Sequence, residues 1–158
     1  MYLSSNAGVH EKGTFTVQDT IDNIKKDPNY LKAGAIGLFI GVVRGETLEG
    51  EKVEKLQLEA YEEKANQVLG KICEDLMQKP GIVNVQIHHL IGEFNVGDDL
   101  VYVAVAGSHR TEIFTVLREA VERYKSEAPV FKKEYTVDAK GSSSEYWVSE
   151  KYNNKHPH

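Results

Sequence analysis

A proline that separates a helical pattern from an extended one constrains the fold of this chain most. Apolar residues at helical spacing end near Lys125, and Pro129 follows shortly after them. Proline cannot continue a helix, and it pushes the preceding Ala128 toward extended geometry. The chain must therefore turn here and resume as a strand. The turn brings Lys125, Lys132 and Lys133 to one junction between two elements.

Lysines gathered at such a junction have two interpretations. Exposed lysines are common, so a solvated basic corner is one of them. The other is a site, because repulsion among ammonium groups lowers their pKa and suits a lysine to proton transfer near neutral pH. Two more basic segments follow apolar runs, Val42-Val43-Arg44-Gly45 and Gly107-Ser108-His109-Arg110. Because loops at strand ends carry many binding sites, the three segments together predict a site for one anionic substrate.

Periodicity predicts the elements around this junction. Strands are expected over Thr14–Val17, Ala35–Val43, Val53–Tyr61, Val83–His89, Asp99–Ala106, Val130–Val137 and Glu145–Ser149. Helices are expected up to Lys26 from a Thr16/Asp19 capping arrangement, over 62–79 and over 110–125. The strand that starts at Ala35 is expected to be buried, with Gly37 and Gly41 marking bulges or close backbone approach. Residues 95–98 are expected to form a hairpin loop.

This order predicts an α+β fold with a mixed or antiparallel sheet covered by two long amphipathic helices. The length suits a single domain spanning residues 1–158. Residues 1–13 and 151–158 are expected to be flexible termini.

Composition excludes several classes of function. The formal net charge is −5, which argues against nucleic-acid and membrane-surface binding, since both need a basic face. The one cysteine, Cys73, falls on an apolar helical stripe and is expected to lie in the core. No signal segment or membrane span is recognised, so a cytoplasmic location is expected. His88 and His89 are adjacent in a strand pattern and point to opposite faces, so they are not expected to share a metal.

Several short segments follow one another in a fixed order between about Gly34 and Glu150. They are Gly41-Val42-Val43-Arg44, Leu58-Glu59-Ala60-Tyr61, Ile91-Gly92-Glu93, Val96-Gly97-Asp98, Ser108-His109-Arg110 and Lys125 through Glu134. Together they resemble the large, catalytic subunit of molybdopterin synthase, the MoaE family. Each segment is weak alone, and the ordered set with its spacing is specific.

The resemblance implies a MoaE-like α/β hammerhead fold and a sulfurtransferase of molybdenum cofactor biosynthesis. Its substrate would be cyclic pyranopterin monophosphate, which becomes the dithiolene molybdopterin. Sulfur would come from the C-terminal Gly-Gly thiocarboxylate of a small ubiquitin-like subunit, in a heterotetramer built on a central dimer of large subunits. No metal or other cofactor is implied, because molybdenum enters the product later.

A cyclic phosphate needs cationic hydrogen-bond donors, which Arg44, His109 and Arg110 are expected to supply. Val42 and Val43 are expected to line the pocket through backbone groups. Two alternatives without a functional role stay open at this point: His109 as a helix cap, and Arg110 as a solvated surface residue.

The resemblance assigns the chemistry to two lysines. Lys125 matches the family's catalytic lysine and would transfer a proton during sulfur addition. Lys132 matches the second lysine and would orient substrate and stabilise negative charge, with Lys133 and Glu134 completing that wall. Phe131 stands where the family often has Trp, which keeps an aromatic group and loses the indole donor.

Two other functions fit part of the pattern. A non-enzymatic binding module would hold a phosphate-bearing ligand or a partner's carboxylate tail in the same basic cluster. A metal-free phosphoesterase would release phosphate without a sulfur donor, although the paired carboxylates or metal cluster of most such enzymes are missing. The identity of the small subunit and the order of the two sulfur additions are not readable from the sequence.

Overall fold

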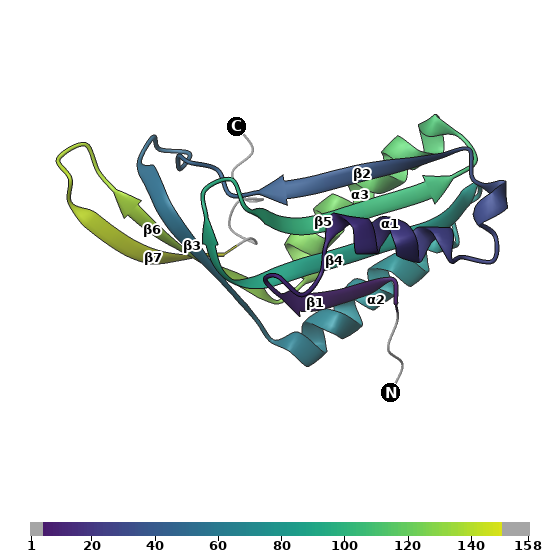
Figure 1. Ribbon diagram of the computed structural model, residues 1–158, viewed down its shortest axis with the longest axis horizontal. Helices are drawn as coiled ribbons and strands as arrows, with labels where there is room; N and C mark the ends of the chain where they lie inside the picture. The colour runs from purple at the N-terminus through teal and green to yellow at the C-terminus, as the bar shows by residue number, and fades with distance from the viewer. Residues whose placement is uncertain (1–4, 150–158) are drawn as a thin grey trace.

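The computed structural model describes residues 5–149. In chain order its elements are β1 (Ala7–Glu11), α1 (Val17–Lys25), a short 3-10 helix (Tyr30–Lys32), β2 (Ala35–Val42), β3 (Lys52–Ala60), α2 (Glu62–Met77), β4 (Ile82–Asn95), β5 (Asp99–Gly107), α3 (Arg110–Glu127), β6 (Val130–Val137) and β7 (Ser143–Ser149). The strands form one sheet in the order β2-β5-β4-β3-β6-β7, with β1 pairing parallel to β4 (Figure 1). The predicted mixed α+β fold is confirmed.

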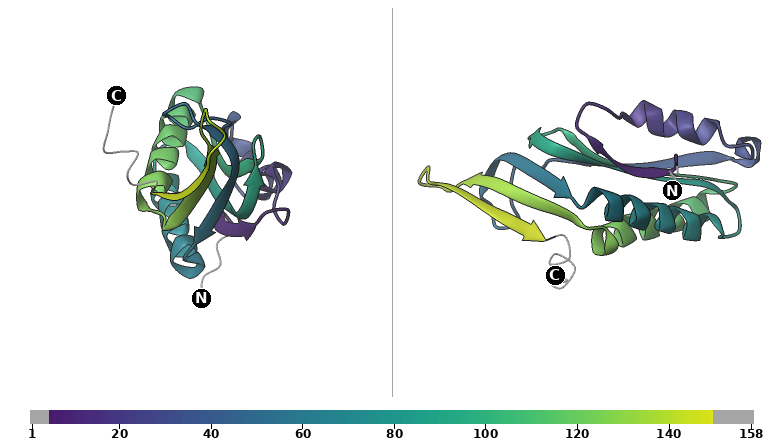
Figure 2. Two further views of the ribbon diagram at one scale, coloured as in Figure 1. Left: turned by 90° about the vertical axis from the view of Figure 1, so that its left-hand side faces the viewer. Right: turned by 90° about the horizontal axis from the view of Figure 1, so that it is seen from below.

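The longest strand, β4, belongs to both halves of the sheet. Its residues 82–89 pair with β5, and its residues 92–95 pair with β3. Gly92 begins the second segment and has φ +122°, a backbone region that side-chain-bearing residues rarely adopt. The strand therefore changes partner across this glycine, and β3, β6 and β7 form a wing that projects beyond the helices (Figures 1 and 2).

Helices α2 and α3 cover one face of the sheet, and α1 covers the other (Figure 2). The predicted apolar stripe of α2 is confirmed, with five buried side chains: Ala65, Leu69, Ile72, Cys73 and Leu76. Each large apolar side chain that is buried contributes about 1.5–3 kcal/mol. Cys73 lies in the core as the sequence predicted, and its burial raises the pKa of its thiol. None of the described helices is long and apolar enough to cross a membrane.

Apolar and polar residues alternate along residues 83–89, a pattern typical of a strand with one exposed face. In the structure, both faces of β4 are buried over most of this segment. Its polar face packs against α1 and carries a chain of side-chain hydrogen bonds that reaches His10 of the neighbouring strand β1. Asn84 donates to Asp27 (2.7 Å), Gln86 donates to Asn84 (2.7 Å), and His88 contacts both Gln86 (2.8 Å) and His10 (2.9 Å). Burial lowers the pKa of His88 to about 3. A buried polar group without a partner would cost about 1–3 kcal/mol, so this chain of bonds lets β4 lie inside.

The N-terminal strand is not where the sequence predicted it. Residues 14–16 form a turn and the helix cap, and β1 lies earlier, within the segment interpreted as a flexible terminus. Contacts with distant parts of the chain fix the position of β1. It pairs with the edge of β4, and Val9 N donates a hydrogen bond to Asn66 Oδ1 on α2 (2.7 Å). The capping box of Thr16 and Asp19 is confirmed. Residues 151–158, the other expected flexible terminus, lie outside the described residues.

Strand β2 is an edge strand, and the expectation that it is buried is wrong. Within residues 5–149 it pairs only with β5, and it leaves Leu38, Ile40 and Val42 respectively 38%, 38% and 52% exposed. Apolar composition was the reason for the error, since it does not tell a buried strand from an edge strand with an uncovered apolar face.

Both glycines of β2 mark close approach, as predicted. A Cβ atom at Gly37 would lie 2.7 Å from Ile113 Cγ2 on α3, and one at Gly41 would lie 2.6 Å from Val101 Cγ1 on β5. The register of β2 also shifts between Gly41 and Val42. Helix α3 can therefore lie flat on β2 only because residue 37 lacks a side chain.

We expect Gly37→Ala to lower the free energy of unfolding by about 1–3 kcal/mol, because the added methyl group overpacks the contact with buried Ile113. Gly70→Ala is the matched control, since a Cβ atom there meets no atom within 4 Å in the interior of α2. It should stabilise the chain by about 0.5–1 kcal/mol. Urea denaturation of both variants measures the difference, and equal effects would contradict the close packing of α3 on β2.

Candidate active site

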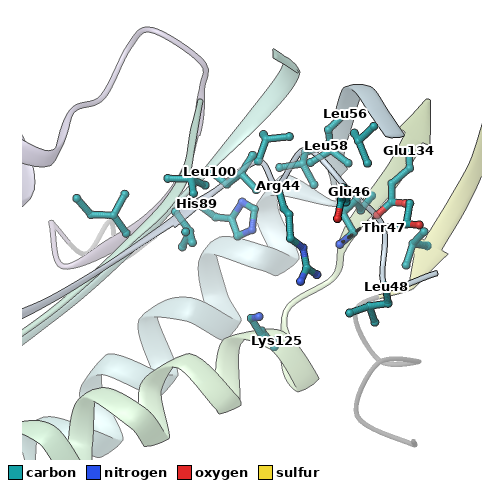
Figure 3. Close-up of a pocket in the computed structure, with 18 of the residues that line it drawn as sticks. Arg44, Glu46, Thr47, Leu48, Leu56, Leu58, His89, Leu100, Lys125 and Glu134 are labelled. Atoms are coloured by element: carbon teal, nitrogen blue, oxygen red, sulfur yellow. Dashed lines mark ion pairs between the residues drawn. The ribbon is translucent and has the colours of Figure 1, made fainter. Parts of the chain in front are cut away.

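A cavity of about 570 Å³ lies where the two halves of the sheet meet, beside the C-terminal end of α3. Small-molecule sites typically occupy about 300–1,000 Å³. Four of the charged residues that the sequence predicts at the site line this cavity: Arg44, Lys125, Lys132 and Glu134. Figure 3 shows Arg44 and Lys125 pointing toward the same space, one from the loop after β2 and the other from α3.

The Pro129 junction builds one wall of this cavity as the sequence predicted. Helix α3 ends with Ala128 N donating to Tyr124 O (3.0 Å), and β6 begins at Val130. Lys125 lies on the last turn and is half-buried, and Lys132 is near the start of the strand. A short irregular connection thus holds both ammonium groups at one cavity.

Alternation along β6 separates the charged residues that the sequence places together. Lys132 pairs across the sheet with Leu58 and Glu134 with Leu56, so both face the cavity. The ammonium group of Lys132 lies 3.7 Å from a carboxylate oxygen of Glu134, and the two side chains are only 19% and 15% exposed. Glu134 therefore compensates part of the positive charge, as expected for one wall of the site.

Lys133 does not belong to this wall, so that expectation is wrong. It pairs with Gln57 on the opposite face of the sheet, since successive residues of a strand point to opposite sides. Its ammonium group lies 3.1 Å from a carboxylate oxygen of Glu145 and 5.5 Å from the ring centres of Tyr135 and Trp147. The hydrogen bond to Glu145 raises the pKa of Lys133.

The Val42–Arg44 segment lines the cavity, but not by the predicted backbone groups. Val43 N donates to Asp98 O (2.9 Å), and Val43 O accepts from Gly97 N (2.9 Å). Both polar backbone groups of Val43 are therefore hydrogen-bonded to the hairpin after β4, and the side chain of Val43 is buried. Val42 and Arg44 are exposed at the rim.

His109 and Arg110 lie at the other end of α3 from Lys125, so a single chain does not bring them to the lysines, and their expected role as substrate ligands stays a prediction. Fifteen residue steps separate Arg110 from Lys125, about 22 Å along the helix axis. Both residues are exposed, and His109 occupies the N-cap position without a side-chain capping bond. The helix expected over residues 110–125 already lies between His109 and Lys125, and its length keeps the two ends apart.

Sequence reasoning missed other residues of the cavity. Tyr124, Leu100 and His89 form its inner side, and residues 46–49 of the loop after β2 border it. His89 was considered only as a metal ligand and set aside. The signal that it lines a cavity was its place as the one polar member of an otherwise apolar strand face, in line with Val83, Val85 and Ile87.

The charge distribution suits the binding of an anion. Arg44, Lys125 and Lys132 line the cavity together with Glu46, Glu49 and Glu134, and the two lysines and the arginine can attract an anionic ligand at short range. Arginine and lysine donate charge-assisted hydrogen bonds to phosphate and carboxylate oxygens. Within residues 5–149 no three His, Cys, Asp or Glu side chains gather in a metal-binding arrangement.

Comparison with known proteins gives this cavity a family context. Residues 9–127 match the family model described as MoaE protein. A probable molybdopterin synthase of Haloferax volcanii is 34% identical over 150 residues, which cover 94% of this chain and 55% of that protein. The molybdopterin synthase catalytic subunit of Pyrococcus abyssi is 38% identical over 115 residues, which cover 73% of this chain and 74% of that protein.

Solved structures agree with the sequence relatives. The crystal structure of molybdopterin synthase from Staphylococcus aureus has a TM-score of 0.77 at 27% identity, over 93% of this chain and 98% of that chain. The same fold occurs at 19% identity, with a TM-score of 0.65, in a complex of subunits 1 and 2 of molybdopterin-converting factor from Helicobacter pylori, over 85% of this chain and 90% of that chain.

The chain belongs to the MoaE family. Its predicted function as a catalytic subunit of molybdopterin synthase, an enzyme of molybdenum cofactor biosynthesis, is thereby confirmed.

The two adjacent lysines of β6 should differ in their effect on catalysis. Lys132→Ala removes a cation from the cavity and should lower kcat/KM for molybdopterin formation about 100-fold. Lys133→Ala changes the opposite face and should stay within about twofold of wild type. Steady-state assays of both variants, with thermal unfolding as the control for folding, make the comparison. A larger loss for Lys133→Ala would contradict the assignment of the two faces.

Proposed function

We propose that this chain transfers sulfur from the C-terminal thiocarboxylate of a small ubiquitin-like subunit to cyclic pyranopterin monophosphate, and so makes the dithiolene of molybdopterin. The observation that carries the proposal is one cavity, in a MoaE-family chain, that gathers Lys125, Lys132 and Arg44. The thiocarboxylate and the cyclic phosphate are both anions, and three cations at one cavity suit their simultaneous binding. A cytoplasmic location stays a prediction from composition.

The geometry supports distinct roles for the two lysines. Lys125 is half-buried on the last turn of α3 and faces Arg44 across the cavity (Figure 3). It is the group we assign to proton transfer as the thiocarboxylate sulfur adds to the pterin side chain and the cyclic phosphate opens. Lys132 is held near Glu134 and stabilises the negative charge that develops on oxygen during this step.

A second copy of the chain supplies the phosphate ligands that this cavity lacks, His109 and Arg110. Strand β2 starts with Ala35 beside Gly107, near these two residues, and ends at the cavity with Val42 beside Asp99. If two copies pair antiparallel along their β2 edges, the start of one β2 lies beside the end of the other. The exposed Leu38, Ile40 and Val42 (38%, 38% and 52%) would be covered in the same contact. This arrangement supports the proposed dimer of large subunits.

The decisive experiment combines the purified chain with a thiocarboxylated small subunit and cyclic pyranopterin monophosphate. Wild type should form dithiolene product, and Lys125→Ala should lose at least about 100-fold in rate, the usual effect of removing a general acid or base. Fold and small-subunit binding should be retained, because Lys125 contributes little to the core. Product is measured by its fluorescent oxidised derivative.

Two alternatives have distinct outcomes in this assay. A folded wild type that binds the small subunit and forms no product would point to the binding module instead. Phosphate release without a sulfur donor would indicate a phosphoesterase. Equal rates for wild type and Lys125→Ala would keep the function and remove the role of Lys125.

The shared site is tested by mixing inactive variants. Lys125→Ala and Arg110→Ala should each be weakly active alone, and mixing them should restore about a quarter of wild-type activity, because half of the randomly formed dimers carry one intact site. The matched control mixes Lys125→Ala with Lys132→Ala. These two residues lie in one cavity of one chain, so this mixture should restore nothing. Equal results for both mixtures would contradict a site shared across β2.

A further inference from the structure

The backbone on both sides of Arg44 is held by hydrogen bonds. Before it, Val43 N donates to Asp98 O (2.9 Å), and Val43 O accepts from Gly97 N (2.9 Å). After it, Gly45 O accepts a hydrogen bond from the backbone of β3 (2.9 Å). Arg44 itself is exposed at the rim of the cavity, so these backbone bonds, and not burial of its side chain, determine where the guanidinium group lies.

The bonds before Arg44 come from a hairpin turn that one carboxylate closes. Residues 96–98 connect β4 to β5, and Asp98 Oδ2 accepts a hydrogen bond from Asn95 N (2.8 Å) across the turn. Asp98 N donates back to Asn95 O (3.0 Å), and Gly97 has φ +90°, which glycine adopts without strain. Asp98 therefore closes the turn with its side chain and holds Val43 with its carbonyl group.

A lysine from the turn after β1 also holds this carboxylate. Lys12 Nζ donates to Asp98 Oδ2 (2.7 Å), and it lies 5.4 Å from the centre of the Phe94 ring. The backbone of Lys12 is fixed as well, because its N donates to Ile91 O (2.8 Å). The hydrogen bonds from Lys12 and from Asn95 N lower the pKa of Asp98, so the carboxylate is ionised at neutral pH and accepts both bonds. An ion pair this exposed adds little to stability, and its effect is to orient the carboxylate.

We propose that Asp98 is a positioning residue, which acts through the backbone of Val43 to hold Arg44 where its guanidinium group binds the cyclic phosphate of the substrate. This inference rests on the proposed function, in which Arg44 is one of the cations that bind anionic groups. Asp98 is not among the described residues that line the cavity, so it acts only through Arg44. A loop that is already held in place loses less conformational freedom when its arginine binds a ligand, and affinity is higher for that reason.

The affinity for cyclic pyranopterin monophosphate, measured by isothermal titration, tests this role. Asp98→Ala removes the acceptor that closes the turn and should weaken binding about 10-fold. Arg44→Ala should weaken it at least as much, because a charge-assisted hydrogen bond to phosphate is lost. The double variant should bind no more weakly than Arg44→Ala alone, since Asp98 acts through Arg44. Losses that multiply to about 100-fold or more would overturn the proposal, because the two residues would then act independently.

Two milder variants extend the test. Asp98→Asn keeps an oxygen that accepts from Asn95 N, and it should stay within about threefold of wild type. An equal loss in Asp98→Asn and Asp98→Ala would overturn the proposal, because closure of the turn would then not be what matters. Lys12→Ala removes one donor to the carboxylate and should weaken binding about threefold, but only where Arg44 is present. The same loss in an Arg44→Ala background would overturn the proposal even if Asp98→Ala failed to fold.

Glu119→Ala is the matched control. Glu119 lies 3.1 Å from Lys79, and this ion pair is about as exposed as that of Asp98. Neither of its members is among the described residues that line the cavity, so the variant should bind substrate as wild type does. Amide hydrogen exchange reads the backbone directly: the N–H of Val43 should exchange faster in Asp98→Ala and at the wild-type rate in Glu119→Ala. Unchanged exchange at Val43 in Asp98→Ala would overturn the proposal.

Turnover separates this role from the function itself. Asp98→Ala should raise KM about 10-fold and leave kcat within about twofold of wild type, because Lys125 and Lys132 are unchanged. If wild type forms dithiolene product and Asp98→Ala binds substrate normally, the sulfur-transfer function stands and the role of Asp98 fails. If wild type does not bind cyclic pyranopterin monophosphate, both fail together. A normal melting temperature for each variant shows that a loss of affinity does not come from unfolding.

Discussion

Strand β4 is the constraint on which the rest of this molecule depends, because among residues 5–149 it is the strand that pairs with both halves of the sheet. Its first part holds β5 and through it β2, and its last part holds β3 and through it the wing of β6 and β7. The positive φ of Gly92 lies where the partners change. Burial on both faces needs the hydrogen-bonded side chains of Asn84, Gln86 and His88. The cavity exists because two sheet halves meet at an angle along this strand.

The electrostatics of the cavity run against those of the whole chain. The formal net charge is −5, so the long-range field does not attract an anion. Attraction must come from Arg44, Lys125 and Lys132 at short range, and the partial burial of the two lysines weakens screening by salt and water. The ion pair of Lys132 with Glu134 reduces the repulsion among these cations. A selective anion site can therefore be built into an acidic protein without a basic surface.

Features that depend on residues close together in the sequence were predicted correctly. The Pro129 junction, the Thr16 capping box and the stripe of α2 each depend on a few neighbouring residues. The errors concern relations between distant segments. Nothing in the residues of β1 indicates that β4 offers it an edge, and nothing in β2 indicates that its outer edge has no partner strand within residues 5–149. The helix between His109 and Lys125 was predicted, but a second copy that brings the two ends together is not visible in the residues of one chain.

Successive side chains of β6 point to opposite faces, and this alternation limits which insertions and deletions the segment can accept during evolution. Lys132 and Glu134 face the cavity, and Lys133 faces the other way, because each is counted from the break at Pro129. Inserting or deleting one residue between the break and Lys132 would exchange the two faces and leave the composition almost unchanged. An even number of residues would restore the faces and shift the strand along its neighbours. Length variation here is therefore constrained by parity, so two related chains can share every residue type in this segment and still differ in what lines the cavity.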